Sequence, residues 1–590
     1  MITKFWLYAA IALLALASCV ISLNSELIYD DERAARELHL VETPTDFRGM
    51  ARQAAPLRQI TLVADAAIWK RDTMGFRATN LVLHALAALS LLALLRRLFN
   101  RQFAVQWAAG LFALMPIGAA AVGVVAHRSE ILGTLMMLLA CLAWLRPQRT
   151  WLAWTVGGVF AVLAAVETSM SLMLPLLLVA YDLLLMAPPQ PERARSRWVE
   201  TGAAALAVSA LHVAHCWWIN VHGYWLPESW EITPAWSDVP IRLARDWPAG
   251  VCVALRWLAI PLPFDYDHGL TPSSWLLTLV GWATLAALVA VIRSQARQRP
   301  RLAFGAAWLL AGCAVAALNV FRSRYGAISE SELYAVAPGL CLLGGIGIER
   351  LCKLERNTTR FWIEIGAAAA AAAVLGAWSN WRASGYGSQE QILNSTLASH
   401  PGSGLAHLEK GRYYLNVMHE SPNKKVARDH AEKEFQEASD LHWDYYETYG
   451  NLGEIAMNRH DYTRAEACYR KAIDLNPASF GARLRLGTAL HAQQRYDAAR
   501  EIYRQLLVEK PRAIDLYRLT ADTYEAEFRY AEARPFLEQA QRLTEELRQK
   551  RLEARGKTAR PADLPADDAP PVITLPATPA SKTNALPKRK

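Results

Sequence analysis

The chain has 590 residues, of which 53% are hydrophobic and only 20% are charged, and it contains 21 tryptophans. A soluble protein of this length carries more charge, so the composition argues against a soluble fold throughout. The formal net charge is +9, but much of the basic excess lies in short arginine clusters between apolar runs, which indicates membrane topology rather than nucleic-acid binding. The apolar residues concentrate before about Trp381, which predicts one membrane domain followed by one soluble domain.

Eleven apolar runs before Trp381 predict eleven membrane-spanning helices. In chain order they cover 5–23, 79–95, 103–125, 131–145, 150–166, 169–186, 199–219, 274–292, 303–320, 333–349 and 361–379. The first run has no clear small-residue cleavage site after it, so we interpret it as a span rather than a removed leader. The stretch 247–262 is interrupted by Arg256 and closed by Pro261 and Pro263, which predicts a re-entrant or interfacial helix.

The positive-inside rule gives the expected orientation. With Lys4 in the cytoplasm, the alternating spans place every short basic cluster inside except Arg322/Arg324. Ionisable residues at span ends then gather on the outer face. They include Asp30, Asp31, Arg58, His127, Arg128, Glu130, Glu167, Asp265 and Glu330. Ionisable groups at membrane depth usually mark a working site, although loop ends can also simply be polar.

The loop 24–78 is long and begins with the acidic residues Asp30 and Asp31. It contains Gln59–Trp69, an amphipathic stretch that is too short to span a membrane. This pattern predicts a helix lying in the membrane interface, which either forms one wall of a cavity or is a plain surface helix.

Three groups of residues are expected to be structural. His84 lies inside an apolar span, which predicts a buried histidine bonded to a neighbouring helix. Asp182 falls on the cytoplasmic side, away from the outer-face charges. The eight cysteines have no metal-ligand spacing, so we interpret them as small core residues.

After Trp381 the sequence contains a 34-residue repeat. The recurring positions are Tyr462, Tyr496 and Tyr530; Leu452-Gly453, Leu486-Gly487 and Thr520-Ala521; and Ala465, Ala499 and Ala533. Small residues at these places let two antiparallel helices approach closely, which is the tetratricopeptide pattern. We expect three clear repeats over about 446–546 and a degenerate fourth over about 404–441. Stacked repeats form a concave groove, usually for a peptide or protein.

These patterns give a domain division for the whole chain. The membrane domain covers 1–380, a linker covers 381–403, and the repeats cover 404–548. The tail, 549–590, is rich in proline, alanine and charge, so we expect it to be disordered.

Several segments resemble one family, and they occur in the family's order. They are Tyr29-Asp30-Asp31, Pro56–Thr61, Gly75–His84, Phe112–Pro116, His127–Glu130, Glu167-Thr168, Leu174-Pro175, Tyr181-Asp182, Asp265-Tyr266, Glu330–Tyr334 and Trp381-Arg382. With the repeats, nearly the whole chain resembles the bacterial relatives of the transmembrane and tetratricopeptide-repeat O-mannosyltransferases, which belong to the GT-C superfamily of lipid-dependent glycosyltransferases. The resemblance implies an all-α protein, with a GT-C-like membrane domain of about eleven spans followed by a tetratricopeptide-repeat solenoid.

The resemblance also implies a reaction, in which a sugar moves from a polyprenyl-phosphate carrier to a protein hydroxyl. By likeness, Asp30 and Asp31 would hold the general base, while Arg58, His127 and Arg128 would bind the lipid phosphate. This chemistry is reasonable because a serine or threonine hydroxyl needs a positioned carboxylate, and a leaving phosphate needs fixed positive charge. The enzyme would sit in the bacterial inner membrane, with its N-terminus cytoplasmic and its repeats and C-terminus periplasmic.

The remaining outer-face residues are expected to line the site: Glu130, Glu167, Asp265, Tyr266 and Glu330. Asp265 could instead bind a metal, but the sequence shows no cluster of ligands. We therefore assign no metal ligand and no required cofactor, and a divalent metal stays an open alternative. The expected partners are the polyprenyl-phosphate sugar, the bilayer, and a protein or peptide bound by the repeats.

Two positions depart from the family pattern. Relatives often carry lysine where this chain has Val166, and they commonly carry arginine where it has Ser331. Because two cationic positions are lost, a second function stays open, in which the chain is a non-enzymatic membrane-anchored scaffold whose repeats recruit a partner. A third alternative is lipid-linked transfer to a glycan or lipid acceptor.

Overall fold

The computed structural model describes residues 2–24, 55–70, 72–99, 102–186, 191–222, 239–259, 275–318, 330–351, 359–385, 388–420, 424–441 and 445–554. Every regular element within these ranges is helical, so the predicted all-α class is confirmed. The chain divides into two compact units, Met1–Ala406 and His407–Lys590, and each is described by itself.

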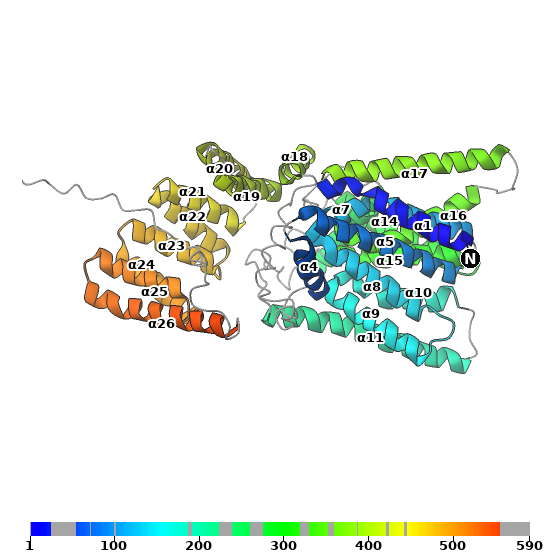
Figure 1. Cartoon of the computed structure of the whole chain (residues 1–590), viewed down its shortest axis with the longest axis horizontal. Coiled ribbons are helices and arrows are strands. Elements are labelled where there is room, and N and C mark those ends of the chain that lie inside the picture. The colour runs from blue at the N-terminus through cyan, green and yellow to red at the C-terminus, as the bar shows by residue number, and fades with distance from the viewer. Residues whose placement is uncertain are drawn as a thin grey trace, which may run out of the picture. The chain divides into compact units, whose positions relative to one another are not determined.

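The first unit consists of long helices that run beside one another, with α4 lying across one end of them (Figure 1). In chain order its elements are α1 (Ile2–Ser18), η1 (Val20–Asn24), α4 (Pro56–Trp69), α5 (Thr73–Leu98), α6 (Gln102–Leu114), α7 (Ile117–Gly123), η2 (Val125–His127), α8 (Arg128–Trp144), α9 (Trp151–Glu167), η3 (Ser169–Leu172), α10 (Met173–Leu184), α11 (Pro191–His222), α12 (Val239–Ile241), η5 (Arg242–Asp246), α13 (Trp247–Ala259), α14 (Trp275–Gln295), α15 (Pro300–Ala316), η7 (Glu330–Ala335), α16 (Ala337–Leu351), α17 (Thr359–Gly385) and α18 (Gln389–Ser399).

Four helical segments of the described residues are long and apolar enough to cross a membrane: Thr73–Leu98, Val125–Trp144, Trp198–Trp218 and Trp275–Gln295. The bent pair α6 and α7 gives a fifth if it is counted as one span. Shorter apolar helices, among them α9 and α15, accompany them. The predicted number of eleven spans therefore stays a prediction.

The predicted span 103–125 is not one straight helix, because α6 and α7 meet at an angle of 50°. Pro116 lies at the break, where it can donate no N–H to the preceding turn. His84 on α5 serves one of the last carbonyls of α6, which lack helical partners, because its Nε2 lies 3.2 Å from the carbonyl oxygen of Ala113. Its Nδ1 lies 2.7 Å from the hydroxyl of Tyr334 in η7.

These two contacts fix the tautomer of His84. A carbonyl oxygen can only accept a hydrogen bond, so Nε2 carries the proton and donates it. Nδ1 is then the acceptor, and the Tyr334 hydroxyl donates to it. The prediction of a buried histidine bonded to a neighbouring helix is confirmed.

A buried polar cluster joins α9, α10 and α11. Arg149, just before α9, forms an ion pair of 2.7 Å with Asp182. Thr201 donates from its hydroxyl to the other oxygen of that carboxylate at 2.6 Å, and it accepts from Nη1 of Arg149 at 3.0 Å. Each buried charge is thus paired and hydrogen-bonded, which confirms the structural role expected of Asp182.

The second unit consists of antiparallel helix pairs (Figure 1). They are α19 (Gly404–Glu420) with α20 (Lys424–Asp440), α21 (Tyr446–Asn458) with α22 (Tyr462–Leu475), α23 (Phe480–Ala492) with α24 (Tyr496–Glu509), and α25 (Ile514–Ala526) with α26 (Tyr530–Ala554). The three predicted repeats and the degenerate fourth all form helix pairs.

The repeat glycines show why glycine recurs at the same position in successive repeats. A Cβ atom on Gly453 would lie 2.5 Å from the ring of Tyr469, and one on Gly487 would lie 2.5 Å from the ring of Tyr503. Both rings belong to the second helix of the same repeat. Glycine is therefore required where the aromatic ring of the second helix crosses the first.

The described ends of the two units differ in detail from the predicted domain boundaries. Helix α17 continues to Gly385, and α18 lies within the predicted linker. Helix α26 continues to Ala554. The remainder of the predicted tail lies outside the described residues.

Candidate functional site

Helix α4 packs against α5, α8 and α9 at one end of the first unit (Figure 1). Its buried residues are Gln59, Leu62 and Asp65, whereas Ile60 and Ile68 are exposed. The polar side of this helix thus faces the protein and part of its apolar side faces outward. The predicted helix over Gln59–Trp69 is confirmed, and this inverted pattern favours a position in the membrane interface.

An ion pair anchors α4 to α8. Nη2 of Arg128 lies 2.6 Å from Oδ2 of Asp65, and the two side chains are only 0% and 6% exposed. Arg128 also donates from Nε to Oδ1 of Asn80 at 2.6 Å and from Nη2 to the carbonyl of Phe76 at 2.7 Å. Thr79 completes the group by donating its hydroxyl to Asp65 at 2.8 Å. The Arg128 charge is therefore neutralised inside the protein.

Side chains of α5 also donate hydrogen bonds to the carbonyl groups at the end of α7. That helix ends at Gly123, and carbonyl groups at a helix end lack partners within the helix. Nδ2 of Asn80 donates to the carbonyls of Val122 at 3.2 Å and Val124 at 3.3 Å. The buried Arg77 donates from Nε to the carbonyl of Gly123 at 3.1 Å. These bonds fix the turn that leads to His127 and Arg128.

Glu167, the last residue of α9, holds the start of α4. Its carboxylate accepts hydrogen bonds from the backbone N–H of Leu57 and, at 3.3 Å, from that of Arg58. The first N–H groups of a helix have no partner within the helix and carry partial positive charge, so a carboxylate is favourable there. Buried Glu167 therefore fixes the position of the α4 N-terminus.

A second contact links the ends of α8 and α9. The hydroxyl of Thr168 donates to the carboxylate of Glu130 at 2.7 Å. Thr168 also accepts from the backbone N–H of Met170 at 3.2 Å, which caps the following turn. Glu130 is half-buried, so its carboxylate lies at the edge of the polar cluster rather than inside it.

Arg58 reaches the turn that contains His127 at the edge of this cluster. Nη1 of Arg58 donates to the carbonyl of Ala126, the residue before His127, at 3.4 Å. Nδ1 of His127 lies 3.1 Å from the carbonyl of Ala120, so this nitrogen carries the proton. Both side chains are half-buried, so a guanidinium and an imidazole ring are partly exposed at this site.

The structure brings together five of the predicted site residues: Arg58, His127, Arg128, Glu130 and Glu167. Four others, Asp30, Asp31, Asp265 and Tyr266, lie outside the described residues. For Glu330 only the backbone, at the start of η7, is described. Among the described residues there is no group of three or more potential metal ligands.

Sequence reasoning missed the partners that hold the site together. Asp65, Asn80 and Arg77 were given no role, although Arg77 and Asn80 lie in the Gly75–His84 segment of the resemblance. The spacing of Gln59, Leu62 and Asp65 is one signal that could have identified the buried face of α4. Arg128 was expected to bind phosphate, and its complete burial beside Asp65 instead favours a role in holding α4.

Comparisons with known proteins give a family only for the repeats. The tetratricopeptide repeat model matches residues 451–514, which confirms the predicted repeat family. A comparison with curated proteins gives no match.

Solved structures resemble the chain at low identity. The oligosaccharyltransferase of Archaeoglobus fulgidus in the apo form is 13% identical with a TM-score of 0.40, over 65% of this chain and 56% of that one. ArnT from Cupriavidus metallidurans bound to undecaprenyl phosphate is 14% identical with a TM-score of 0.33, over 85% and 80%. A MamA protein is 20% identical with a TM-score of 0.25, over 29% and 86%.

Proposed function

We propose that this protein is an integral-membrane glycosyltransferase that moves a sugar from a polyprenyl-phosphate donor to a protein hydroxyl. The observation that carries the proposal is the half-buried Arg58, whose backbone N–H donates to Glu167 and whose guanidinium donates to the carbonyl of Ala126, the residue before His127. The family resemblance of the surrounding segments supports it independently.

In this proposal Arg58 stabilises the leaving lipid phosphate. Charge develops on the phosphate as the glycosidic bond breaks, and a fixed guanidinium stabilises it without reorganising. Arginine also offers a planar fork that matches two phosphate oxygens. Glu167 aids this function indirectly, because it fixes the backbone from which Arg58 extends. His127 is assigned to the same phosphate by resemblance.

The general base is assigned to Asp30 or Asp31 by resemblance. Either carboxylate would accept the proton of the acceptor hydroxyl while the hydroxyl oxygen attacks the anomeric carbon of the sugar. Arg128 is assigned a positioning role, since its charge is already paired with Asp65. The repeats would hold the acceptor protein or an assembly partner.

The test compares glycans in cells that express wild type or variants at equal levels. Protein glycans and surface glycans are analysed by mass spectrometry. Asp30→Asn/Asp31→Asn should abolish a defined hexose mass on particular serine or threonine sites. Arg58→Ala should lower transfer about 100-fold, the effect of losing one transition-state charge donor, and Arg58→Lys should retain part of the activity.

A matched control is Lys70→Ala, because Lys70 is an exposed cation at the opposite end of the same helix. This variant should transfer sugar like wild type. Full transfer by Arg58→Ala would refute the phosphate assignment, and full transfer by Asp30→Asn/Asp31→Asn would refute the base.

A second candidate function is a non-enzymatic scaffold. The neutral residues Val166 and Ser331, at positions that are commonly cationic in relatives, favour it. In that case the repeats would still retain a partner, and no glycan would change in any variant. A change confined to non-protein glycans would instead identify a different acceptor for the same chemistry.

A further inference from the structure

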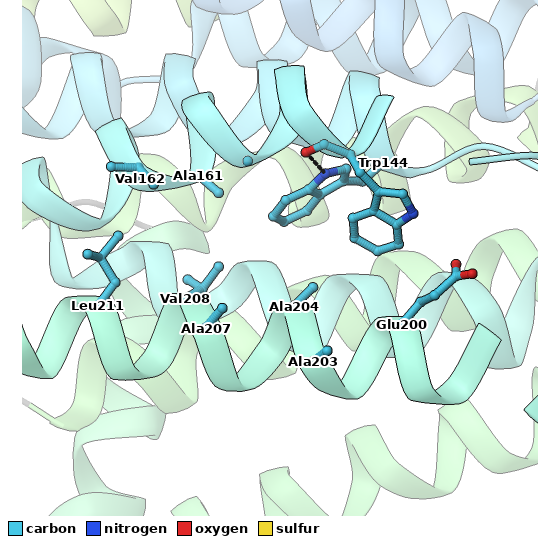
Figure 2. A pocket seen from close by; sticks show the side chains of 11 residues that line it. Trp144, Ala161, Val162, Glu200, Ala203, Ala204, Ala207, Val208 and Leu211 are labelled. Atoms are coloured by element: carbon cyan, nitrogen blue, oxygen red, sulfur yellow. Dashed lines mark hydrogen bonds between the residues drawn. The ribbon is translucent and has the colours of Figure 1, made fainter. Parts of the chain in front are cut away.

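A groove lies between α9 and α11, in a part of the first unit that the proposed reaction does not use (Figure 2). Its volume is about 460 Å³, within the roughly 300–1,000 Å³ of typical ligand pockets. The residues that line it are Trp144, Trp154, Gly158, Ala161, Val162, Glu200, Ala203, Ala204, Ala207, Val208 and Leu211. All but Glu200 are apolar, and five are glycine or alanine.

The small residues on the two helices do not close the space between them. A Cβ atom added to Gly158 on α9 would meet nothing within 4 Å. Across the groove, α11 presents alanines such as Ala204 and Ala207, while the Trp144 ring extends between the helices nearer Glu200 (Figure 2). Helices with small residues can pack in direct contact in a membrane, so the observed gap needs another occupant.

Water is a poor occupant of this groove. A bound water needs two to four polar partners, and the middle of the groove offers only hydrocarbon side chains. The surrounding surfaces are also apolar, since Val159 on α9 and Leu206 on α11 are exposed. Only 11% of the Trp198–Trp218 window is buried inside the protein. A hydrocarbon chain therefore fits both the groove and its surroundings.

The position of the groove decides which lipid supplies that chain. Glu200 lies at one end of the groove (Figure 2). Two exposed tryptophans mark the same end, Trp151 at the start of α9 and Trp198 two residues before Glu200 on α11, as is typical of residues at a membrane interface. Glu167 lies nine residues beyond Gly158, about 13 Å along α9 at 1.5 Å per residue. A chain that enters at the tryptophan end thus comes from the leaflet opposite the candidate catalytic site.

We infer that this groove, defined by Gly158, Ala161, Ala204 and Ala207, is a binding site for one acyl chain of a phospholipid from the leaflet at the tryptophan end. The chain fills the space between α9 and α11 and joins α11 to the rest of the unit. The site is distinct from the proposed donor site, so the inference does not depend on the transferase activity.

The experiment uses the full chain in nanodiscs that contain phosphatidylcholine with a photoactivatable diazirine on one acyl chain. After irradiation, the labelled peptides are identified by mass spectrometry. We expect strong labelling of the α9 and α11 peptides that line the groove. In a second sample the protein is transferred into detergent before irradiation. If the same peptides are still labelled, the lipid was held in the groove and was not bulk lipid.

Two glycines provide matched variants. Gly158→Leu places a side chain in the groove. Gly202→Leu places the same side chain on α11, at a residue that does not line the groove, and there a Cβ also meets nothing within 4 Å. Each CH₂ group of the acyl chain that is displaced from the groove weakens lipid binding by a factor of about four. If the leucine side chain displaces two CH₂ groups, groove labelling should fall about fifteenfold. Gly202→Leu should label like wild type.

Three outcomes would overturn the inference: labelling that is uniform over all lipid-facing helices, equal loss in both variants, or displacement of the label by added polyprenyl phosphate. The last result would identify the donor chain as the occupant. Circular dichroism of both variants establishes that each is folded, so a loss of labelling reports on the groove itself.

Discussion

Replacement of Asp65 by alanine should release α4 from the first unit. The change leaves the guanidinium of Arg128 buried without its acidic partner, which lies 2.6 Å away in the native protein. Breaking a buried ion pair by removing one member costs about 3–5 kcal/mol. Because α4 must break this contact to open, its opening equilibrium should increase by at least about 150-fold, at 1.4 kcal/mol per factor of ten.

Amide hydrogen exchange measured by mass spectrometry tests this expectation. Peptides covering α4 should exchange faster in Asp65→Ala than in wild type. Peptides from α22 and α24 provide an internal control, since they belong to the second compact unit and should be unchanged. The variant is studied as the full chain in the same detergent as wild type.

A double variant separates the lost pair from other effects of the substitution. In Asp65→Leu/Arg128→Met the buried charge is removed together with its partner, and such replacements are often neutral or stabilising. We therefore expect α4 to be protected again, at least in part. The reasoning is refuted if Asp65→Ala leaves α4 exchange unchanged, or if the double variant exchanges as fast as the single one.

Three further perturbations have expected outcomes. Gly453→Ala should lower the unfolding free energy of the repeats by about 1–3 kcal/mol through overpacking. Gly450→Ala in the same helix should not, because its Cβ meets only a side-chain nitrogen at 3.9 Å; equal amide exchange rates of α21 in the two variants would contradict this. His84→Phe should cost about 1–3 kcal/mol by leaving buried polar groups unsatisfied, and adding Tyr334→Phe should recover part of the loss in a thermal melt; a further drop would contradict the bond. Arg495→Ala breaks an ion pair between exposed Arg495 and half-buried Glu466. Glu466 keeps Arg470 and Gln493 as partners, so the change should cost less than about 1 kcal/mol in the same melt, and a larger loss would show that the pair is structural.

Local patterns in the sequence were sufficient for the repeats. The 34-residue spacing predicted the helix pairs because each repeat closes on itself, and its glycine and aromatic positions contact one another within the same pair, as Gly453 and Tyr469 do. Local patterns also predicted the α4 helix and the buried, bonded state of His84. The repeats and α4 were predictable because their helices follow a regular spacing of residues along the chain. His84 was predictable because leaving a polar group unpaired in an apolar span costs free energy.

The sequence alone did not determine the partners within the candidate site. By family likeness Arg128 was expected to bind the lipid phosphate, yet the fold pairs it with Asp65 and Asn80. The bend at Pro116 likewise turned one predicted span into two helices.

What the sequence by itself determined is the helical class, the repeat architecture and the set of charged residues at helix ends. What only the tertiary structure decided is which of those charges neutralise one another and which remain at the surface. Arg58 and Arg128 are the same residue type at similar places in the pattern, but one is half-buried and the other is fully buried. The physical reason is that pairing depends on distances between segments far apart in the chain, which neither composition nor periodicity contains.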